Sequence, residues 1–305
     1  VENLIGDIPG LGLKQATKVF GYTRVMVAAM ALGGGEAALE IAIAYAKERI
    51  QFKTPLSEKQ GYTHKLIVPH VIRLAAAEAY IEEVAERLDS GEKELEVEGS
   101  ISKLFATESA NKAADDAMQA LGGYGYITEY EVEKIKRDVR ITSIYEGTSE
   151  IQQNIISTFR WKKTRKSKGE FYQSISDEMD KLHAESGDFG CGIYGLAARA
   201  LNQTITLVND HRLTRRQYIM FALADMMTHV EVGAGLARRA LKCSRRGDSG
   251  AEKIKLISRL FGNEVAQVVS QNILKIVLGC GEFDQKTTAD FLAKVGYTEL
   301  TTGFQ

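Results

Sequence analysis

The sequence predicts an all-α protein, because it gives helices long uninterrupted stretches and gives strands almost none. Only three prolines, Pro9, Pro55 and Pro69, occur in its 305 residues, and proline is the residue that most strongly breaks a helix. Apolar residues recur at the spacing of one helix face through most of the chain. The length suffices for two domains, and an apolar share of 44% supports packed cores.

The chain opens with the one segment that reads as a strand. Residues 1–6 suggest the end of a β-strand, and the turn-forming stretch 7–12 closes it. Apolar spacing then predicts a first helix over about residues 14–50. The glycine triplet 33–35 interrupts this helix and lowers its propensity, which we expect close packing against a neighbour to offset.

Two further helices follow from their end signals. Residues 57–60, Ser-Glu-Lys-Gln, form a capping box for a second helix that runs to about Ser90, with a kink at Pro69 and a stop at Gly91. A third helix spans about residues 95–121 and ends at two glycines.

A short fourth helix and a longer fifth helix complete the first half. Residues 128–131, Thr-Glu-Tyr-Glu, cap the fourth helix, and the fifth starts just after Glu146. Four substantial helices and one short connector within about 160 residues suit an antiparallel helical bundle.

The composition changes at residues 162–168, where five of seven residues are basic and none is large and apolar. We interpret this run as a solvated hinge; contact with an anionic membrane is the alternative. The chain is therefore expected to form two helical domains, residues 1–161 and 162–305. In the second domain, apolar spacing predicts helices near residues 171–184, 194–209, 215–243, 253–278 and 289–295.

Charge, cysteine and histidine usage exclude several classes of protein. A net charge of −1 argues against nucleic-acid binding, which needs a basic excess. The three cysteines lie far apart and the five histidines show no ligand spacing, so we expect neither disulfides nor a metal site. No run of about 18 apolar residues occurs, so no transmembrane segment is expected.

The most informative segment is residues 144–152, Ile-Tyr-Glu-Gly-Thr-Ser-Glu-Ile-Gln, which places a lone carboxylate, Glu146, on a glycine turn that opens a helix. Thr148 or Ser149 can cap this helix, whose free N–H groups favour an anion nearby. The apolar neighbours would partly dry the carboxylate, which suits a catalytic base. The plain alternative is a solvated charge favoured by the helix dipole.

Three further motifs stand in order around this turn: Glu-Arg-Ile-Gln-Phe at residues 48–52, Gln-Ala-Leu-Gly-Gly-Tyr-Gly-Tyr at 119–126, and Arg-Asp at 137–138. Together with the Glu146 turn they resemble the acyl-CoA dehydrogenase family, over about residues 4–160. We expect residues 119–125 and Glu146 to form one cleft.

The resemblance implies a domain organisation. Residues 1–161 would be the family's C-terminal helical bundle, with residues 1–12 ending a middle β-domain, and residues 162–305 the additional helical domain of larger, long-chain-type members. In those members the extension covers a surface that shorter members use to form tetramers, so a homodimer is implied. The chain reads as a fragment without the N-terminal and β-domains, and we expect it to be inactive alone.

The family oxidises an acyl-CoA thioester to the trans-2-enoyl-CoA with FAD and passes the electrons to electron transfer flavoprotein. The resemblance implies that Glu146 is the catalytic base and that its backbone N–H donates to the thioester carbonyl. Some members carry the base within the stretch matching residues 20–24, where this chain has no acid. The implied substrate-binding residues are Phe20, Arg24 near the CoA moiety, Tyr145, and Gly147, where a side chain would crowd the ligand.

In the family both subunits of a dimer contact the FAD. The cofactor-binding residues that the resemblance implies are Arg49 and Phe52 on the partner's dinucleotide, Gln60, Gln119, Gly122 and Gly123 at the adenosine pyrophosphate, and Thr148 and Glu150 beside the base. The chain has Phe52-Lys53 where the family usually has Phe-Gly, so a different turn is expected there.

Two alternatives to a dehydrogenase stay open. An acyl-CoA oxidase shares the base and the flavin but passes electrons to oxygen, and a catalytically silent helical scaffold keeps only the bundle. The unpaired cysteines indicate a reducing compartment, either the bacterial cytoplasm or the mitochondrial matrix.

Overall fold

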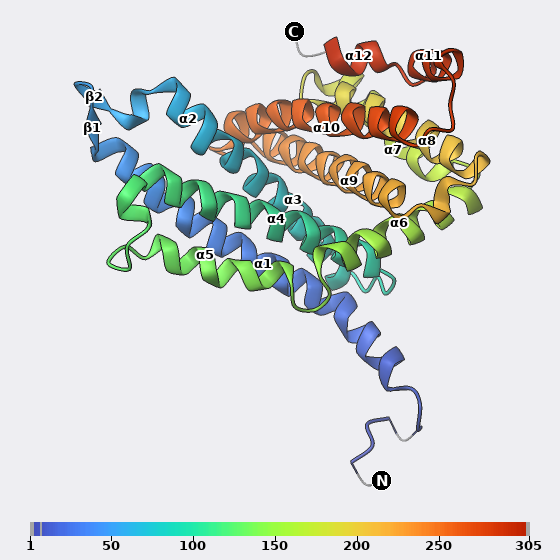
Figure 1. The fold of residues 1–305 in the computed structure, drawn as a ribbon, viewed down its shortest axis with the longest axis horizontal. Helices are drawn as coiled ribbons and strands as arrows, with labels where there is room; N and C mark the ends of the chain where they lie inside the picture. Colours follow the sequence, from blue (N-terminus) through green and yellow to red (C-terminus); the bar gives the residue numbers. More distant parts are fainter. Residues whose placement is uncertain (1–2, 7, 303–305) are drawn as a thin grey trace.

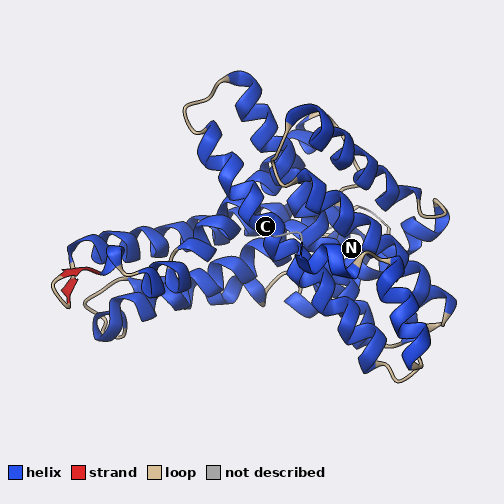
Figure 2. Cartoon of the chain, turned by 90° about the horizontal axis from the view of Figure 1, so that it is seen from above, coloured by secondary structure: helices blue, strands red, loops and turns tan. Residues whose placement is uncertain are grey.

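Helices make up nearly the whole chain in the computed structural model, which describes residues 3–6 and 8–302 (Figures 1 and 2). Within these residues the only strands are β1, Ile50–Gln51, and β2, Thr54–Pro55, which pair as a short antiparallel hairpin. Figure 2 places this hairpin at an extreme end of the molecule. The all-α prediction is therefore confirmed.

The strand predicted at the start of the chain is wrong where it can be checked. Residues 3–6 form turns, and residues 1–2 and 7 lie outside the described residues. The chain then enters its first helix at Gly12.

The first half is a bundle of long helices packed along one another (Figure 1). Its helices are α1 (Gly12–Glu48), α2 (Gln60–Leu66), α3 (Val68–Asp89), α4 (Glu96–Leu121), α5 (Val132–Arg140) and α6 (Ser149–Lys166). The non-consecutive helices α1 and α4 pack along each other in the same direction: a Cβ on Gly21 would lie 3.8 Å from the Cα of Glu96, and a Cβ on Gly35 2.9 Å from the Cα of Ala110.

The glycine triplet 33–35 does not interrupt α1, which continues through it. A Cβ on Gly34 would lie 2.5 Å from Cγ1 of Val139 on α5, and Gly35 faces α4 equally closely. The expected close packing is confirmed at these two positions, whereas Gly33 faces open space. Tertiary packing therefore outweighs the low helical propensity of glycine here.

The predicted second helix is two helices. The chain breaks at Ile67, with φ −121° and ψ −62°, and Pro69 stands in the first turn of α3 rather than at a kink. Proline is tolerated in a first turn because its missing N–H has no partner there in any helix. The predicted capping box is also wrong: residues 56–58 form a short 3₁₀ helix, and no side chain caps α2.

The second half is a further set of packed helices in which α9 and α10 lie side by side (Figure 1). Its helices are α7 (Glu170–Ser186), α8 (Cys191–Asp210), α9 (Gln217–Arg246), α10 (Ala251–Gly279), α11 (Gln285–Lys294) and α12 (Tyr297–Thr302). Each predicted helix has a counterpart, and α12 is an element that the sequence analysis missed.

The basic run that we interpreted as a hinge is helical. α6 continues to Lys166, and Thr164, within the run, is 3% exposed. One hydrophobic core cluster includes side chains from both halves. The boundary between residues 161 and 162 thus lies inside a helix, and the division into two domains stays a prediction.

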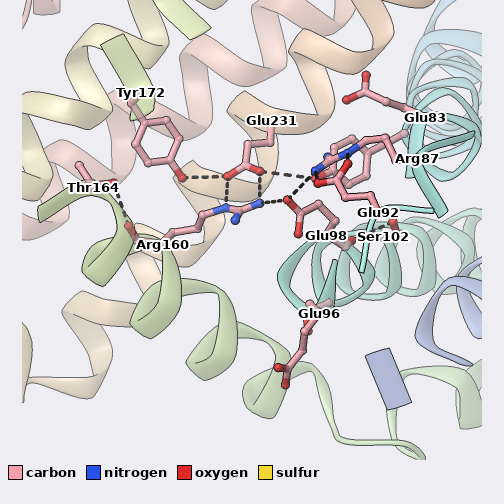
Figure 3. Close-up of polar contacts among 12 residues, drawn as sticks. Glu83, Arg87, Glu92, Glu96, Glu98, Ser102, Arg160, Thr164, Tyr172 and Glu231 are labelled. Carbon is pink, nitrogen blue, oxygen red and sulfur yellow. Dashed lines mark hydrogen bonds and ion pairs between the residues drawn. The ribbon is translucent and has the colours of Figure 1, made fainter. Parts of the chain in front are cut away.

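A buried group of charges joins the halves (Figure 3). Arg160 of α6, 3% exposed, donates to both carboxylate oxygens of Glu231 on α9 at 2.8 and 2.7 Å. Glu231 also accepts from the Tyr172 hydroxyl at 2.9 Å, and Arg160 lies 3.0 Å from Glu98 of α4. Burial raises the pKa of Tyr172 well above its usual range, so its hydroxyl stays a donor. Desolvation of such charges is offset only by complete pairing.

Two helices are long and apolar enough to cross a membrane by length and composition, although we expected none. The apolar window of α9 is 83% buried and that of α1 is 44% buried. Core helices of bundles have the same composition, so these two helices are weak evidence for a membrane span. In the part of the chain that the structure describes, no group of three or more His, Cys, Asp or Glu residues could hold a metal ion.

Candidate active site

Glu146 stands on the turn before α6 with a left-handed backbone. Its φ is 54°, and φ is 92° at Gly147. For a residue other than glycine this conformation costs on the order of 1 kcal/mol, and such strain gathers at functional sites. A Cβ on Gly147 would lie 2.8 Å from Nε2 of Gln152. The chain itself therefore requires glycine at 147, a reason independent of ligand crowding.

The carboxylate of Glu146 is held from α1. The Thr23 hydroxyl donates to its Oε2 at 2.7 Å. The next residue, Arg24, is 4% exposed; it donates to Ser100 at 3.1 Å and lies 3.7 Å from Glu96. Burial lowers the pKa of Arg24, against the attraction of the Glu96 and Glu146 carboxylates. Arg24 is thus an interior residue near Glu146, and its contact with CoA stays a prediction.

Two buried side chains hold the backbone of the turn. Lys103 of α4 donates from Nζ to the carbonyl oxygen of Gly147 at 2.7 Å. Gln152 of α6 donates from Nε2 to the same oxygen at 2.9 Å and to the Glu146 carbonyl oxygen at 3.2 Å. Both side chains are 0% exposed. The turn is therefore fixed by three helices, with Thr23 contributed by α1.

The first turn of α6 is not capped as predicted. Thr148 occupies the N-cap position without a side-chain cap hydrogen bond, and the hydrogen bond from its hydroxyl lowers the pKa of Glu150. Ser149 donates from its hydroxyl to Oε1 of Glu108 on α4. Two acidic side chains thus lie beside the start of the helix, which the helix dipole favours.

The apolar residues around Glu146 do not enclose it. Ile144 is 46% exposed, Ile151 49% and Phe20 37%. An exposed apolar stripe continues along α1 through Val19, Tyr22, Met26 and Met30. The drying that we expected at the carboxylate is therefore not supplied by the described residues alone, and this surface offers an apolar face for a ligand or further protein to cover.

Six of the eight predicted cofactor residues lie at the opposite end of the bundle from Glu146 (Figure 1). Arg49 follows the last turn of α1, and among the described residues it forms no ion pair. Phe52 lies in the hairpin turn with 90% of its surface exposed. Lys53 has φ 73°, a conformation that glycine favours. Lysine thus adopts the left-handed backbone where the family usually has glycine.

The remaining residues of this end are exposed and open. A Cβ on Gly122 or Gly123 would meet nothing within 4 Å, and the neighbouring Gln119 and Gln60 side chains are exposed. Open space above two glycines would let a phosphate-bearing cofactor approach the backbone closely.

The two groups of predicted residues do not form one cleft within this chain. Thr148 and Glu150 lie beside Glu146, but Lys103, which touches the Glu146 turn, and Gln119 are separated by about 24 Å along α4. The expectation of a single cleft made by Glu146 and residues 119–125 is therefore wrong for one copy of the chain. The two groups lie at different ends of α4.

Three residues of the site were missed in the sequence analysis: Thr23, Lys103 and Gln152. Thr23 and Gln152 carry no signal that separates them from surface residues. Lys103 offers one, because it interrupts the apolar neighbours Ile101, Leu104 and Phe105 on a helix with a buried face. A lysine is almost never fully buried unless it has a specific partner.

Comparison with known proteins matches residues 10–159 to the family described as acyl-CoA dehydrogenase, C-terminal domain. An acyl-CoA dehydrogenase of Bacillus subtilis is 43% identical over 157 residues, 52% of this chain and 41% of that protein. The 3-(aryl)acrylate reductase of Clostridium sporogenes is 42% identical with the same coverage. Subunit CarC of the caffeyl-CoA reductase-Etf complex of Acetobacterium woodii is 38% identical over 162 residues, 53% of this chain and 42% of that protein.

The chain spans about two fifths of the length of these curated relatives. A solved structure shares the fold of both halves: the acyl-CoA dehydrogenase of Bacillus anthracis complexed with FAD has a TM-score of 0.78 over 96% of this chain and 54% of that one, at 20% identity. Three findings on the first half point to the same family: its sequence identity to the relatives, its helical-bundle fold and its match to the family model. Residues 10–159 therefore belong to the acyl-CoA dehydrogenase family, as its C-terminal domain.

Proposed function

We propose that the protein catalyses the FAD-dependent α,β-dehydrogenation of an acyl-CoA thioester, with Glu146 as the base. The observation that carries this proposal is a carboxylate on a strained turn, bonded by Thr23 at 2.7 Å while Lys103 and Gln152 fix its backbone. A solvated surface charge needs no such support. The family to which residues 10–159 belong supports the reaction class.

The backbone beside the carboxylate supports the same chemistry. Among the described residues, no group accepts a hydrogen bond from the N–H of Glu146. This donor is therefore free for the thioester carbonyl oxygen, where negative charge develops as Glu146 removes the proton from the α-carbon. Bound FAD would supply the acceptor for the hydride that leaves the β-carbon. One residue would thus take the proton and stabilise the charge that its removal creates.

The separated groups of residues favour a dimer as the active form. Thr148 and Glu150 would contact the cofactor next to Glu146, and Arg49, Phe52, Gln60, Gln119, Gly122 and Gly123 the cofactor of a second copy. The exposed apolar face of α1, with Met26 65% and Met30 66% exposed, would be covered in the complete enzyme. Electron transfer flavoprotein is the proposed acceptor, supported by the relative named as part of an Etf complex.

The decisive variant is Glu146→Gln, made in the protein with its natural ends. We expect flavin and acyl-CoA binding to persist and turnover to fall by at least about a thousandfold, because the amide of glutamine cannot accept the proton. Flavin absorbance, acyl-CoA affinity and enoyl-CoA formation are measured over a panel of chain lengths. The matched control is Glu129→Gln, an exposed glutamate in the loop before α5, which should keep full activity.

Three results would reject the proposal or part of it. Near-normal turnover in Glu146→Gln removes Glu146 as the base. Absence of flavin from the protein with its natural ends leaves only the helical scaffold. Rapid reoxidation of the reduced enzyme by oxygen in stopped-flow experiments identifies an acyl-CoA oxidase instead of a dehydrogenase.

A further inference from the structure

Lys103 is a buried cation whose main contact is with the Glu146 turn. It is 0% exposed on α4, and its Nζ donates to the Gly147 carbonyl oxygen at 2.7 Å. Among the described residues it forms no ion pair. Burying an ammonium without a carboxylate partner costs several kcal/mol in general. Neither helix packing nor a salt bridge therefore explains why this lysine is buried. The explanation that remains is its hydrogen bond to the Glu146 turn.

The backbone of the Glu146 turn has a conformation that needs stabilising contacts. Glu146 and Gly147 both have left-handed φ values, 54° and 92°. The two carbonyl oxygens that close the turn receive donors from opposite sides of the sequence: Lys103 from α4 and Gln152 from α6. Because the peptide unit is planar, fixing a carbonyl also fixes the N–H that it is joined to. The bond from Gln152 to the Glu146 carbonyl oxygen thus orients the peptide plane that follows Glu146, and the bonds from Lys103 and Gln152 to the Gly147 carbonyl oxygen orient the next plane.

We propose that Lys103 is a positioning residue for Glu146: its ammonium holds the Gly147 carbonyl, which keeps the turn in the left-handed conformation that presents the base. This inference rests on the proposed function, because positioning matters only if Glu146 reacts. The effect of Lys103 on the backbone of the turn can nevertheless be measured without an activity assay.

The charges around Lys103 are compatible with its role as a hydrogen-bond donor to the turn. Burial lowers its pKa to about 8, Arg24 acts in the same direction, and the carboxylates of Glu146 and Glu108 oppose the shift. Charged or neutral, the amine keeps an N–H for the carbonyl. The hydrogen bond therefore survives across neutral pH.

The test compares Lys103→Met with Lys112→Met in the protein with its natural ends. Methionine keeps the length and apolar stem of lysine, so Lys103→Met removes the donor with little change in volume. Lys112 lies on the same helix with 51% of its side chain exposed. In Lys103→Met we expect the amide that joins the turn to α6, the Gln152 N–H that donates to the Thr148 carbonyl oxygen at 3.0 Å, to exchange at least about tenfold faster. We expect kcat to fall about ten- to a hundredfold and KM to change less than about threefold. Lys112→Met should show neither change.

Unchanged exchange of the Gln152 amide in Lys103→Met overturns the inference, whatever happens to Glu146→Gln. Accelerated exchange with normal activity of Glu146→Gln rejects the proposed function and the positioning role with it. If Lys103→Met does not fold, the wild-type protein decides by NMR: titration of Lys103 should move the amide signals of residues 146–149, and signals that stay still while Lys103 titrates overturn the inference.

Discussion

Glu146 owes its position to side chains from three helices, one of which bonds the carboxylate and two of which bond the backbone of the turn. Thr23 of α1 binds the carboxylate, and Lys103 of α4 and Gln152 of α6 bind the backbone. The motif identified the acid because its glycine and its helix are local in sequence. It could not identify Thr23 or Lys103, which are 123 and 44 residues away from their bonded partners. Only the packing of helices brings them together.

At the scale of single residues, Lys103 makes stability depend on pH. Its pKa is lowered to about 8 in the folded protein and is about 10.4 in an unfolded chain. Between these values the unfolded state binds more protons, so the free energy of unfolding rises with pH; below about pH 8 the penalty is fully present. Relative to Lys103→Met, the wild type should gain on the order of 2 kcal/mol between about pH 7.5 and 10.5.

Urea denaturation of both proteins across this interval measures the difference. Tyrosines and other titrating groups are common to the two proteins and cancel in the comparison. A difference in stability that does not change with pH would contradict the lowered pKa of Lys103.

At the scale of elements, the sequence predicted the positions of most helices because apolar periodicity is a local property. It did not predict the break at Ile67, because Pro69 fits a kink and a first turn equally well. The basic run 162–168 was interpreted as a hinge from composition, yet α6 continues because Thr164 packs inside. Long-range packing, which composition does not record, decides these cases.

The glycine triplet in α1 gives a matched pair of substitutions for the contact between α1 and α4. A Cβ on Gly35 would lie 2.9 Å from the Cα of Ala110 and 3.0 Å from Cδ2 of Leu74, whereas on Gly33 it would meet nothing within 4 Å. Gly35→Ala should destabilise the protein by about 1–3 kcal/mol through overpacking. Gly33→Ala should stabilise it by about 0.5–1 kcal/mol because alanine favours helix.

Chemical denaturation of the two variants under the same conditions tests this pair. Equal effects at the two positions would mean that α1 and α4 are not packed as closely as the structure has them.

At the scale of the whole molecule, the two halves are held together by buried charge as well as by apolar packing. Arg160→Met leaves Glu231, 6% exposed, and Glu98, 4% exposed, without their shared cation. We expect this variant to lose about 3–5 kcal/mol of unfolding free energy. Arg137→Met removes a cation that is 70% exposed and pairs with Glu133, whose side chain is 15% exposed, and should change stability by less than about 1 kcal/mol.

The double variant Arg160→Met/Glu231→Leu should recover part of the loss, since it removes the buried carboxylate that Arg160→Met leaves unpaired. Equilibrium denaturation followed by circular dichroism measures all three proteins. A loss below about 1 kcal/mol in Arg160→Met would show that the network contributes little to holding the halves together.

The single helix α6 contacts both the Glu146 turn and the second half of the chain. Gln152, which bonds the Glu146 turn, and Arg160, which bonds α9, lie about 12 Å apart along the same helix. An α-helix is stiff over this length, so a shift of α9 that tilts α6 would also move Gln152 and with it the turn that carries Glu146. With Glu146 as the proposed base, substitutions in the second half that loosen the Arg160 network should therefore lower turnover, although they lie far from the reacting atoms.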